Sequence, residues 1–489
     1  MAVIYDRGIR KSYIFIAALF AMFLFLSKIR EPICRADEQA NVGEQSLDFT
    51  SLSLEELKQV MIISVLKKPE KLTEATSAIS VITQEDIRRS GATSIPELLR
   101  RVPGFQVAQM SSNTWAVSAR GFNHRYANKL LVLMDGRSLY TPLFSGVYWN
   151  VQDISLEDIE RIEVIRGPGA TLWGANAVNG VINIITRKAK DTQGGLVTSG
   201  LGNELKRFST FRYGGRWGDN AFGRVYLQYS ERDSLSYTSG DEGNDQWDSL
   251  RGGFRIDRSS SEGDLFTLLG DMYRGRDGDK MIFCPPSPPP DPNLEIADTE
   301  LESVDLKSTF LGGYLLGRWQ HRISNTSDMT VQLYYDRTQQ EKEYSSNSQY
   351  RERFDILDFD FQHSFKPANH HEIIWGLGYR FISDHFEART SEMPVFILNP
   401  SSRKTDITSA FVQDGMDIID DKLQLIAGSK FEHNDYTGFE VQPSLRLLLK
   451  LSRAQNLWTS ISRAVRTPSR SEYDPVSDIG IDDPNRPPW

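Results

Sequence analysis

One stretch of the chain decides its fold: residues 166–186 read RGPGATLWGANAVNGVINIIT. The opening Gly-Pro-Gly is typical of a tight turn, and the closing VINIIT is rich in the β-branched residues that strands favour. The glycines and asparagines between them are typical of a loop. The stretch therefore predicts a strand that ends at a turn, a glycine-rich loop and a second strand.

The glycines of this stretch also have to be compared with nucleotide-binding loops. A phosphate-binding loop ends in Gly-Lys followed by Ser or Thr, whereas Gly174 is followed by Ala175 and Asn176. A dinucleotide-binding loop would need glycine at position 172, which is Leu172. We therefore interpret the glycines as turn residues that let neighbouring segments approach closely.

Composition narrows the class of protein. The 489 residues are enough for two large units, and the formal net charge of -9 argues against a nucleic-acid-binding protein. Only 39% of the residues are hydrophobic, which excludes a bundle of apolar membrane helices. Aromatic residues at 11%, together with 36 glycines, suit a protein of many strands and turns. A transmembrane β-barrel has such a composition because alternate strand residues face a wet interior.

Residues 1–36 have the pattern of an export signal. Arg7, Arg10 and Lys11 precede an apolar run over residues 14–26, which is short for a bilayer span. We expect a cleaved signal peptide, with a retained membrane anchor as the alternative.

Residues 71–190 mix strands with helices. The run 78–83 is β-prone, and Thr83 has the position of a helix cap, followed by acidic residues in the first turn. A second helix is expected from Ile95, with Pro96 near its start. Further strands are expected at residues 105–107, 116–122, 130–134 and 159–165. This order predicts a mixed α/β unit.

From residue 194 onward the strands alternate with a period of two. In residues 224–229 every second residue is apolar, and residues 355–362 show the same pattern. Polar insertions separate such runs. A transmembrane barrel and a soluble β-sandwich both produce this alternation, so the pattern leaves the two open.

Several segments together resemble the TonB-dependent outer-membrane receptors. In the first part, the resemblance is carried by residues 166–186 and by VITQEDI, IPELL, RGF, VLMDG and IERIEVIRGP, which begin at residues 81, 95, 120, 132 and 159. In the second part it is carried by AFVQD, LQLIAG and WTSISRAVRTPS, which begin at residues 410, 423 and 458.

The resemblance implies a mixed α/β plug domain over residues 71–190, followed by part of an antiparallel transmembrane β-barrel over residues 194–489. It implies a monomer in the outer membrane of a Gram-negative-type bacterium, coupled to the TonB complex. The implied function is uptake of a scarce ligand, first of all a ferric siderophore. Cobalamin, another metal chelate or a carbohydrate are alternatives. No cofactor, metal, nucleic acid or enzymatic activity is implied.

The resemblance also assigns candidate site residues. Residues 37–70 would form a periplasmic segment whose Ile62, Ile63, Ser64 and Val65 pair with TonB by strand addition, although a buried strand is the simpler interpretation. The plug motifs supply a further set of candidate residues: Arg120, Gly121, Asp135, Gly136, Arg161, Glu163, Arg166, Gly167, Pro168, Gly174 and Asn183. If the motif arginines are buried, we expect them to pair with barrel carboxylates such as Asp358 or Asp360; ordinary surface arginines are the alternative.

Strand number is the point at which the chain departs from the family, whose barrel has 22 strands. About three hundred residues follow the plug, which gives about 14 strands at roughly 20 residues each. Two prolines before Trp489 are unsuited to a central strand. We therefore expect a partial barrel that needs further strands to close.

Two other classes of protein compete with a transporter. A surface or signalling receptor without transport would usually carry an extra folded domain before the plug. A secreted β-sandwich or β-propeller enzyme would need a catalytic cluster, and the sequence shows none, so we expect no catalytic residue.

Overall fold

The computed structural model describes residues 61–64, 70–260, 263–283, 302–345, 348–389, 397–452 and 455–476. The expected signal peptide, the residues before Met61 and Val65 lie outside them. Among the described residues, no helix is long and apolar enough to cross a membrane.

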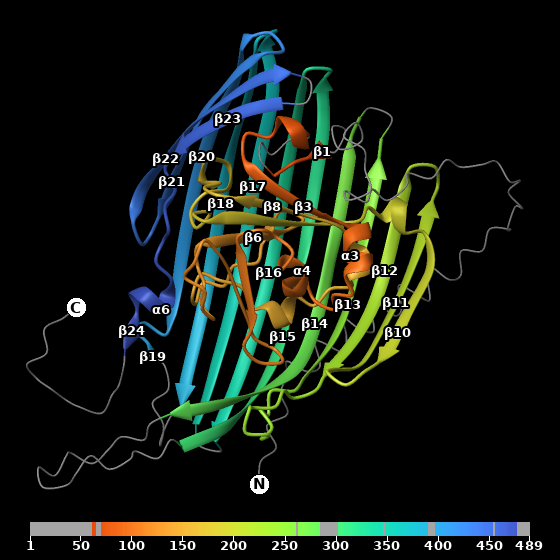
Figure 1. Ribbon diagram of the computed structural model, residues 1–489, viewed down its shortest axis with the longest axis vertical. Coiled ribbons are helices and arrows are strands. Elements are labelled where there is room, and N and C mark those ends of the chain that lie inside the picture. Colours follow the sequence, from red (N-terminus) through yellow and green to blue (C-terminus); the bar gives the residue numbers. More distant parts are fainter. Residues whose placement is uncertain are drawn as a thin grey trace, which may run out of the picture. The chain divides into compact units, whose positions relative to one another are not determined.

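The plug is built on a five-stranded sheet with the strand order β3-β8-β9-β6-β7 (Figure 1). Only the β6–β9 pair is parallel. The apolar residues of the central strands are buried, which explains their nearly unbroken hydrophobic sequence. The strands are β3 (Ala78–Thr83), β6 (Leu130–Met134), β7 (Arg137–Ser138), β8 (Ile159–Arg166) and β9 (Gly180–Thr186).

Helices and a hairpin cover this sheet. Helix α3 (Gln84–Ser90) begins at a capping box between Thr83 and Asp86. Helix α4 (Ile95–Leu99) has Pro96 in its first turn. The remaining elements are the hairpin β4 (Phe105–Gln109) and β5 (Trp115–Ala119), and the 3₁₀ turns η2 (Trp149–Gln152), η3 (Leu156–Asp158) and η4 (Ala189–Thr192).

The glycine-rich stretch itself holds an element that its sequence does not reveal. A short helix, α5 (Ala170–Trp173), stands where a loop is expected. The strand before it and the strand after it are as expected. A turn of helix flanked by Gly169 and Gly174 is too short to leave a helical period in the sequence.

The chain enters the plug through a small hairpin. Strand β1 (Met61–Ile62) pairs antiparallel with β2 (Glu70–Lys71), and the 3₁₀ turn η1 (Leu72–Glu74) follows.

The second part of the chain is one antiparallel sheet of 13 strands in sequence order, close to the expected 14. Its first and last strands, β10 and β23, each pair on one side only within the described residues. The strands are β10 (Gly194–Leu201), β11 (Leu205–Trp217), β12 (Ala221–Arg232), β13 (Trp247–Ser259), β14 (Leu265–Phe283), β15 (Glu302–Ser324), β16 (Ser327–Ser345), β17 (Ser348–Ala368), β18 (His371–Arg389), β20 (Ser402–Ile419), β21 (Leu423–Asn434), β22 (Gly438–Ser452) and β23 (Gln455–Ser462). A separate pair joins β19 (Ile397–Leu398) to β24 (Pro475–Val476), next to helix α6 (Arg470–Tyr473).

The two ends of these strands differ in the length of their connections. At one end, which we name the turn edge, the connections are short, such as residues 218–220, 325–326 and 420–422. At the other, the loop edge, they include residues 233–246 and 284–301. Membrane barrels have short periplasmic turns and longer outer loops, so the loop edge faces outward.

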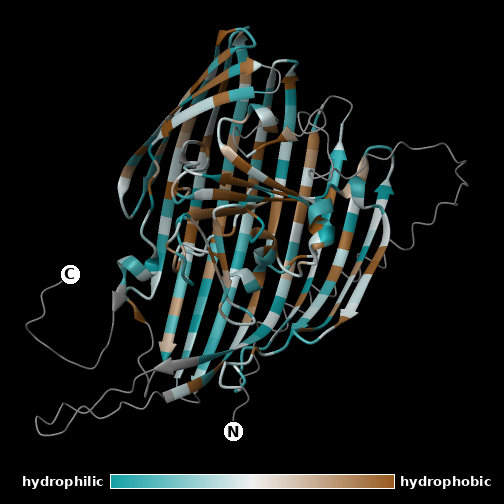
Figure 2. Ribbon diagram, viewed as in Figure 1, coloured by the Kyte–Doolittle hydropathy of each residue, from teal (hydrophilic) through white to brown (hydrophobic). Residues whose placement is uncertain are grey.

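Hydrophilic and hydrophobic residues alternate along the strands (Figure 2). Their burial is the reverse of that in a soluble protein. Arg224 and Gln228 are buried, whereas Leu227 between them is 53% exposed. On β17, Asp358 is buried, whereas its apolar neighbours Leu357 and Phe359 are 41% and 38% exposed. An apolar outer face and a polar inner face are suited to lipid outside and a filled interior. This reversal excludes the soluble β-sandwich.

Candidate functional site

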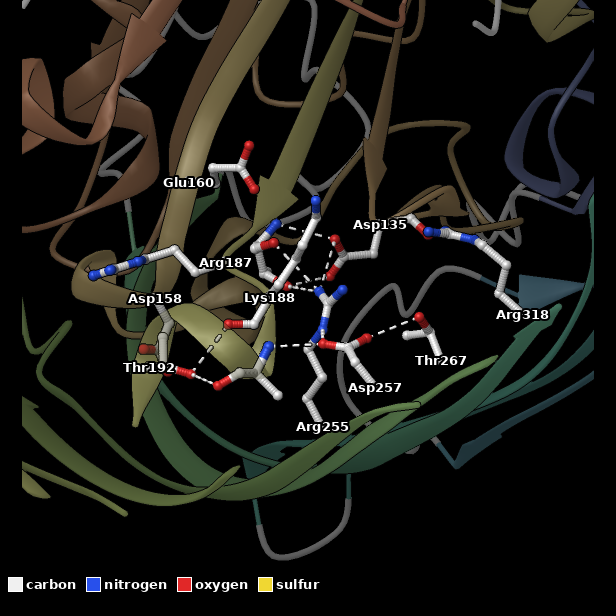
Figure 3. Close-up of polar contacts among 12 residues, drawn as sticks. Asp135, Asp158, Glu160, Arg187, Lys188, Thr192, Arg255, Asp257, Thr267 and Arg318 are labelled. Carbon is white, nitrogen blue, oxygen red and sulfur yellow. Dashed lines mark hydrogen bonds and ion pairs between the residues drawn. The ribbon is translucent and has the colours of Figure 1, made fainter. Parts of the chain in front are cut away.

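We name the 13-stranded sheet the wall. The plug is held to the wall by a cluster of buried charges around Asp135 (Figure 3). Asp135 directly follows β6 and accepts hydrogen bonds from the backbone N–H and Oγ1 of Thr186, at 3.0 and 2.7 Å. Arg255 on β13 donates to Thr186 Oγ1 at 2.9 Å and lies 4.0 Å from the Asp135 carboxylate. Asp257 accepts from Arg255 Nε at 2.8 Å and from the Ala189 N–H at 2.7 Å. One network therefore joins two plug strands to the wall.

A second carboxylate of the plug extends this attachment. Asp158, 5% exposed, forms an ion pair with Arg212 on β11, and Arg224 on β12 lies 4.0 Å away. Arg224 also donates to the carbonyl of Arg187 at 2.8 Å. The plug thus supplies carboxylates and the wall supplies guanidinium groups on this side.

Arg137 reverses this arrangement, because here the plug supplies the cation and the wall supplies the carboxylate. It follows the Asp135–Gly136 turn and forms a 2.5 Å ion pair with Asp336 on β16, with its guanidinium 3.9 Å from the ring centroid of Tyr314. Burial acts to lower the pKa of Arg137, but Asp336 together with Tyr314 and other neighbouring groups outweighs it, and the pKa stays above its ordinary value. Gly136 has a φ of +81°, and a Cβ there would lie 2.9 Å from Gln332 Oε1. The turn has to be glycine for this approach to the wall.

The expected pairing of the motif arginines with Asp358 or Asp360 is wrong. Arg161 pairs with Glu160 and Glu163 on its own strand. Arg120 donates to the carbonyl of Arg166, and Arg166 donates to the carbonyl of Pro103. Asp358 is paired with Arg380 of the neighbouring strand. These arginines therefore bond to groups within the plug itself.

The tip of the β4–β5 hairpin is inserted into the loop edge. Ser112 donates through its N–H to Asp245 at 2.6 Å and through its hydroxyl to the carbonyl of Asp233 at 2.8 Å. Asn113 donates to the carbonyl of Gly278 at 2.7 Å, and Trp247 donates to the Ser112 carbonyl at 3.0 Å. Asp245 therefore holds the hairpin.

Met61–Ser64 is the described part of the segment expected to meet TonB. It is held by hydrogen bonds to a carboxylate of the plug. Glu163, fully buried, accepts the N–H of Ile63 at 3.1 Å and the N–H of Ser64 at 2.8 Å. The Ser64 hydroxyl also donates to Glu163 and accepts from Asn183 Nδ2 at 3.0 Å. Trp173 Nε1 donates to the Ser64 carbonyl at 2.8 Å. Arg161 donates to Glu163 at 2.8 Å, which balances its charge. We name this arrangement the Glu163 clasp.

Substituting Glu163→Gln is expected to loosen this segment. Glutamine keeps the shape but removes the charge, and a hydrogen bond to a charged group contributes about 1.5–3 kcal/mol. We expect the amide of Ser64 to exchange its hydrogen at least about tenfold faster. Hydrogen exchange followed by mass spectrometry checks this, with Glu160→Gln on the same strand as control. Equal exchange in Glu163→Gln and the unsubstituted protein would show that the carboxylate does not hold the segment.

After β23 the chain leaves the wall and runs along the plug. The barrel-like stretch 458–469 leaves the sheet after Ser462, and residues 463–474, which we name the inner strap, contact the plug instead. Asn176 donates its N–H to the carbonyl of Val465 at 2.8 Å and its Nδ2 to Thr467 Oγ1 at 3.1 Å. The N–H of Thr467 donates a hydrogen bond to Asn176 Oδ1 at 3.0 Å.

A cavity of about 280 Å³ separates the other side of the plug from the wall. Plug residues Trp173 and Asn176 line it, opposite Arg380, Lys430 and Glu432 of the wall. Gly174 has a φ of +87°, which favours glycine, and a Cβ there would lie 2.8 Å from Glu432 Oε2. The plug is therefore attached by ion pairs on the side of β11–β13, whereas the cavity borders the wall from β15 to β21.

The remaining motif residues lie within the plug. Gly121 and Gly167 have φ values of +88° and +125°, and Asn183 lies in the clasp. Pro168 sits in the turn before α5. The Arg120–Gly121–Phe122 turn is strained, since Arg120 and Phe122 also have positive φ, at +60° and +58°. This turn begins a loop at residues 120–129 that reaches the loop edge, where Arg125 lies 3.2 Å from Asp279 near the end of β14.

Comparison with known proteins establishes the class. The family model described as the TonB-dependent Receptor Plug Domain matches residues 71–181, and the TonB dependent receptor-like beta-barrel model matches residues 165–487. The chain belongs to the TonB-dependent receptors, a family of transporters and receptors in the outer membrane of Gram-negative bacteria. The expected fold class and location are confirmed.

Relatives in sequence include vitamin B12 transporters. The vitamin B12 transporter BtuB of Vibrio vulnificus is 32% identical over 153 residues, which are 31% of this chain and 24% of that protein. BtuB of Photobacterium profundum is 32% identical over 42% of this chain and 31% of its own length. This chain thus matches less than a third of these relatives' length.

Solved structures share the fold at low identity. The ferric enterobactin receptor PfeA of Pseudomonas aeruginosa has a TM-score of 0.63 at 18% identity, over 81% of this chain and 64% of that one. The siderophore receptor PirA of Acinetobacter baumannii has a TM-score of 0.62 at 18% identity, over 82% and 63%.

Proposed function

We propose that the chain takes part in TonB-coupled uptake of a ferric siderophore of the anionic, aromatic kind. The single observation that carries the choice of ligand is the chemistry of residues 120–129. This loop has the sequence RGFNHRYANK, with two arginines, a lysine and a histidine but no acidic residue. It lies at the loop edge, where a ligand arrives from outside.

The loop presents its rings and cations to solvent. Phe122 is 73% exposed and Tyr126 is 49% exposed. Lys129 Nζ lies 4.2 Å from the ring centroid of Phe122, so cation and ring form one surface. Tyr126 packs edge-on against Phe144 at 5.1 Å, which holds the loop in place.

Such a surface favours an anionic aromatic chelate over a cobalamin. Cations attract the negative charge of a ferric catecholate, and exposed rings stack on its aromatic groups. The sequence relatives that transport vitamin B12 keep cobalamin as the second candidate. Energy would be supplied by TonB, with Ile62, Ile63, Ser64 and Val65 as the segment that pairs with it.

The test is ligand binding to the receptor in outer-membrane vesicles. Ferric enterobactin is expected to bind, and Arg120→Gln together with Lys129→Gln should weaken it at least about tenfold, more at low salt than at high salt. Lys422→Gln, which removes a cation at the turn edge, is the matched control and should leave binding unchanged. Binding of cyanocobalamin without binding of ferric enterobactin would replace the siderophore by cobalamin.

A further inference from the structure

We propose that the inner strap and helix α5 couple the outer mouth of the receptor to the Glu163 clasp. A displacement of the strap would then release Met61–Ser64 at the opposite edge. This inference rests on the proposed function only in taking Met61–Ser64 as the segment that meets TonB.

The outer end of the strap is fixed by a fully buried arginine. Arg470 Nε lies 3.1 Å from Asp384 near the end of β18, and Arg470 also pairs with Asp474. Arg403 of β20 pairs with Asp474 at 2.6 Å. The N–H of Arg470 also donates to the carbonyl of Pro142 in the plug at 3.1 Å. The strap therefore moves with the loop edge, where β18 ends and β20 begins.

The middle of the strap is attached to the loop that follows α5. The bonds between Asn176 and residues 465 and 467 involve both the backbone and the side chain of Asn176. Asn176 has a φ of +72°, a conformation that asparagine tolerates better than most residues. A shift of the strap therefore acts directly on the end of α5.

The inner end of the path is Trp173, the last residue of α5. Its indole N–H is bound to the carbonyl of Ser64 at 2.8 Å. Leu172, 1% exposed, packs with Ile374 and Phe411 of the wall, which gives α5 a pivot. Only Gly174 and Ala175 separate Trp173 from Asn176, so the clasp and the strap are attached to the two ends of one short segment.

The asymmetry of the plug explains why this segment can move alone. The cavity of about 280 Å³ borders Trp173 and Asn176 and leaves room for them. Away from the cavity, the plug is fixed by Asp158, which pairs with Arg212 of the wall. A pull from the strap therefore shifts α5 before it shifts the plug.

Thiol labelling tests the coupling without any ligand. Cys34 and Cys284 are replaced by serine, Ile63→Cys supplies the probe site, and a maleimide reports how often Met61–Ser64 opens in outer-membrane vesicles. Asn176→Gly, which keeps the positive φ free of strain, and Thr467→Val are each expected to raise the labelling rate at least about fivefold. The double variant should exceed the faster single variant only slightly, because both remove one contact.

The control is Ser112→Ala, which weakens an equally polar attachment of the plug on the far side and should leave the rate unchanged. Only protein with heat-modifiable mobility on gels is compared, so that misfolded variants are left out. A rate in Asn176→Gly and Thr467→Val equal to that of the parent would overturn the coupling, as would an equal rise in Ser112→Ala.

Uptake of ferric enterobactin separates this inference from the proposed function. If labelling responds to Asn176→Gly but uptake proceeds without TonB, the proposed function fails and the coupling stands. If uptake requires TonB but labelling does not respond, the coupling alone fails.

Discussion

Replacing Ile63 by proline is expected to abolish energy-coupled uptake and to leave ligand binding intact. Proline has no N–H, so it removes the bond from Ile63 to Glu163 and a donor that strand pairing with TonB would use. The loop at residues 120–129 lies at the opposite edge and is untouched. Uptake and surface binding of a radiolabelled ferric siderophore by whole cells measure the two effects separately, and we expect uptake to fall at least about a hundredfold.

Ile63→Val is the matched control, since it keeps the backbone N–H and the β-branched side chain. It should support nearly normal uptake. Normal uptake in Ile63→Pro would place the energy-coupling segment elsewhere in the chain. Loss of binding along with uptake would show a folding defect in place of a coupling defect.

Arg470→Ala is expected to cause the largest loss of stability among single substitutions outside the plug. Arg470 is fully buried between Asp384 and Asp474, so its removal leaves Asp384 without its cation and Asp474 with Arg403 alone. Breaking a buried ion pair in this way costs about 3–5 kcal/mol. The midpoint of thermal unfolding, followed by the loss of heat-modifiable mobility on gels, should fall clearly.

Arg403→Ala provides the comparison for this prediction. The Arg403 side chain is 22% exposed, and Asp474 would keep its pairing with Arg470, so the loss of stability should be smaller. An unchanged midpoint in Arg470→Ala would mean that the strap is not held by this charge.

The sequence predicts the plug well because its strands are buried and apolar. Ile159–Arg166 and Leu130–Met134 form strands as expected, and Thr83 caps a helix as expected. Helix α5 is missed because four residues between glycines carry no helical period. The alternation of apolar and polar residues identifies the strands of the wall but does not show which face meets lipid. The burial of Arg224 and the exposure of Leu227 show that the apolar face is the outer one.

Contacts between the plug and the wall are the part that sequence reasoning misses. The motif arginines Arg120 and Arg161 suggest a positive plug, yet the attachment uses Asp158 of the plug and Arg212 of the wall. Arg212 and Asp158 are 54 residues apart, and nothing local marks them as partners. Asp135 and Gly136 stand out as a motif, but their closeness to Arg255 and Gln332 follows only from the fold. The roles proposed for the motif residues remain predictions.

The β1–β2 hairpin determines how the plug responds to mechanical tension. Met61 is paired with Lys71, and just beyond it the wall holds η1, where Asn456 donates to the Thr73 carbonyl at 2.6 Å and Lys450 lies 3.1 Å from Glu74. A pulling force on the chain before Met61 thus acts on the open end of the β1–β2 pair, in which β2 is fixed by its attachment to the wall. Such a force breaks the hydrogen bonds between β1 and β2 one after another, so they do not all have to break at the same time. The force reaches the Glu163 clasp only after the hairpin has parted, so the work of opening is divided into small successive steps.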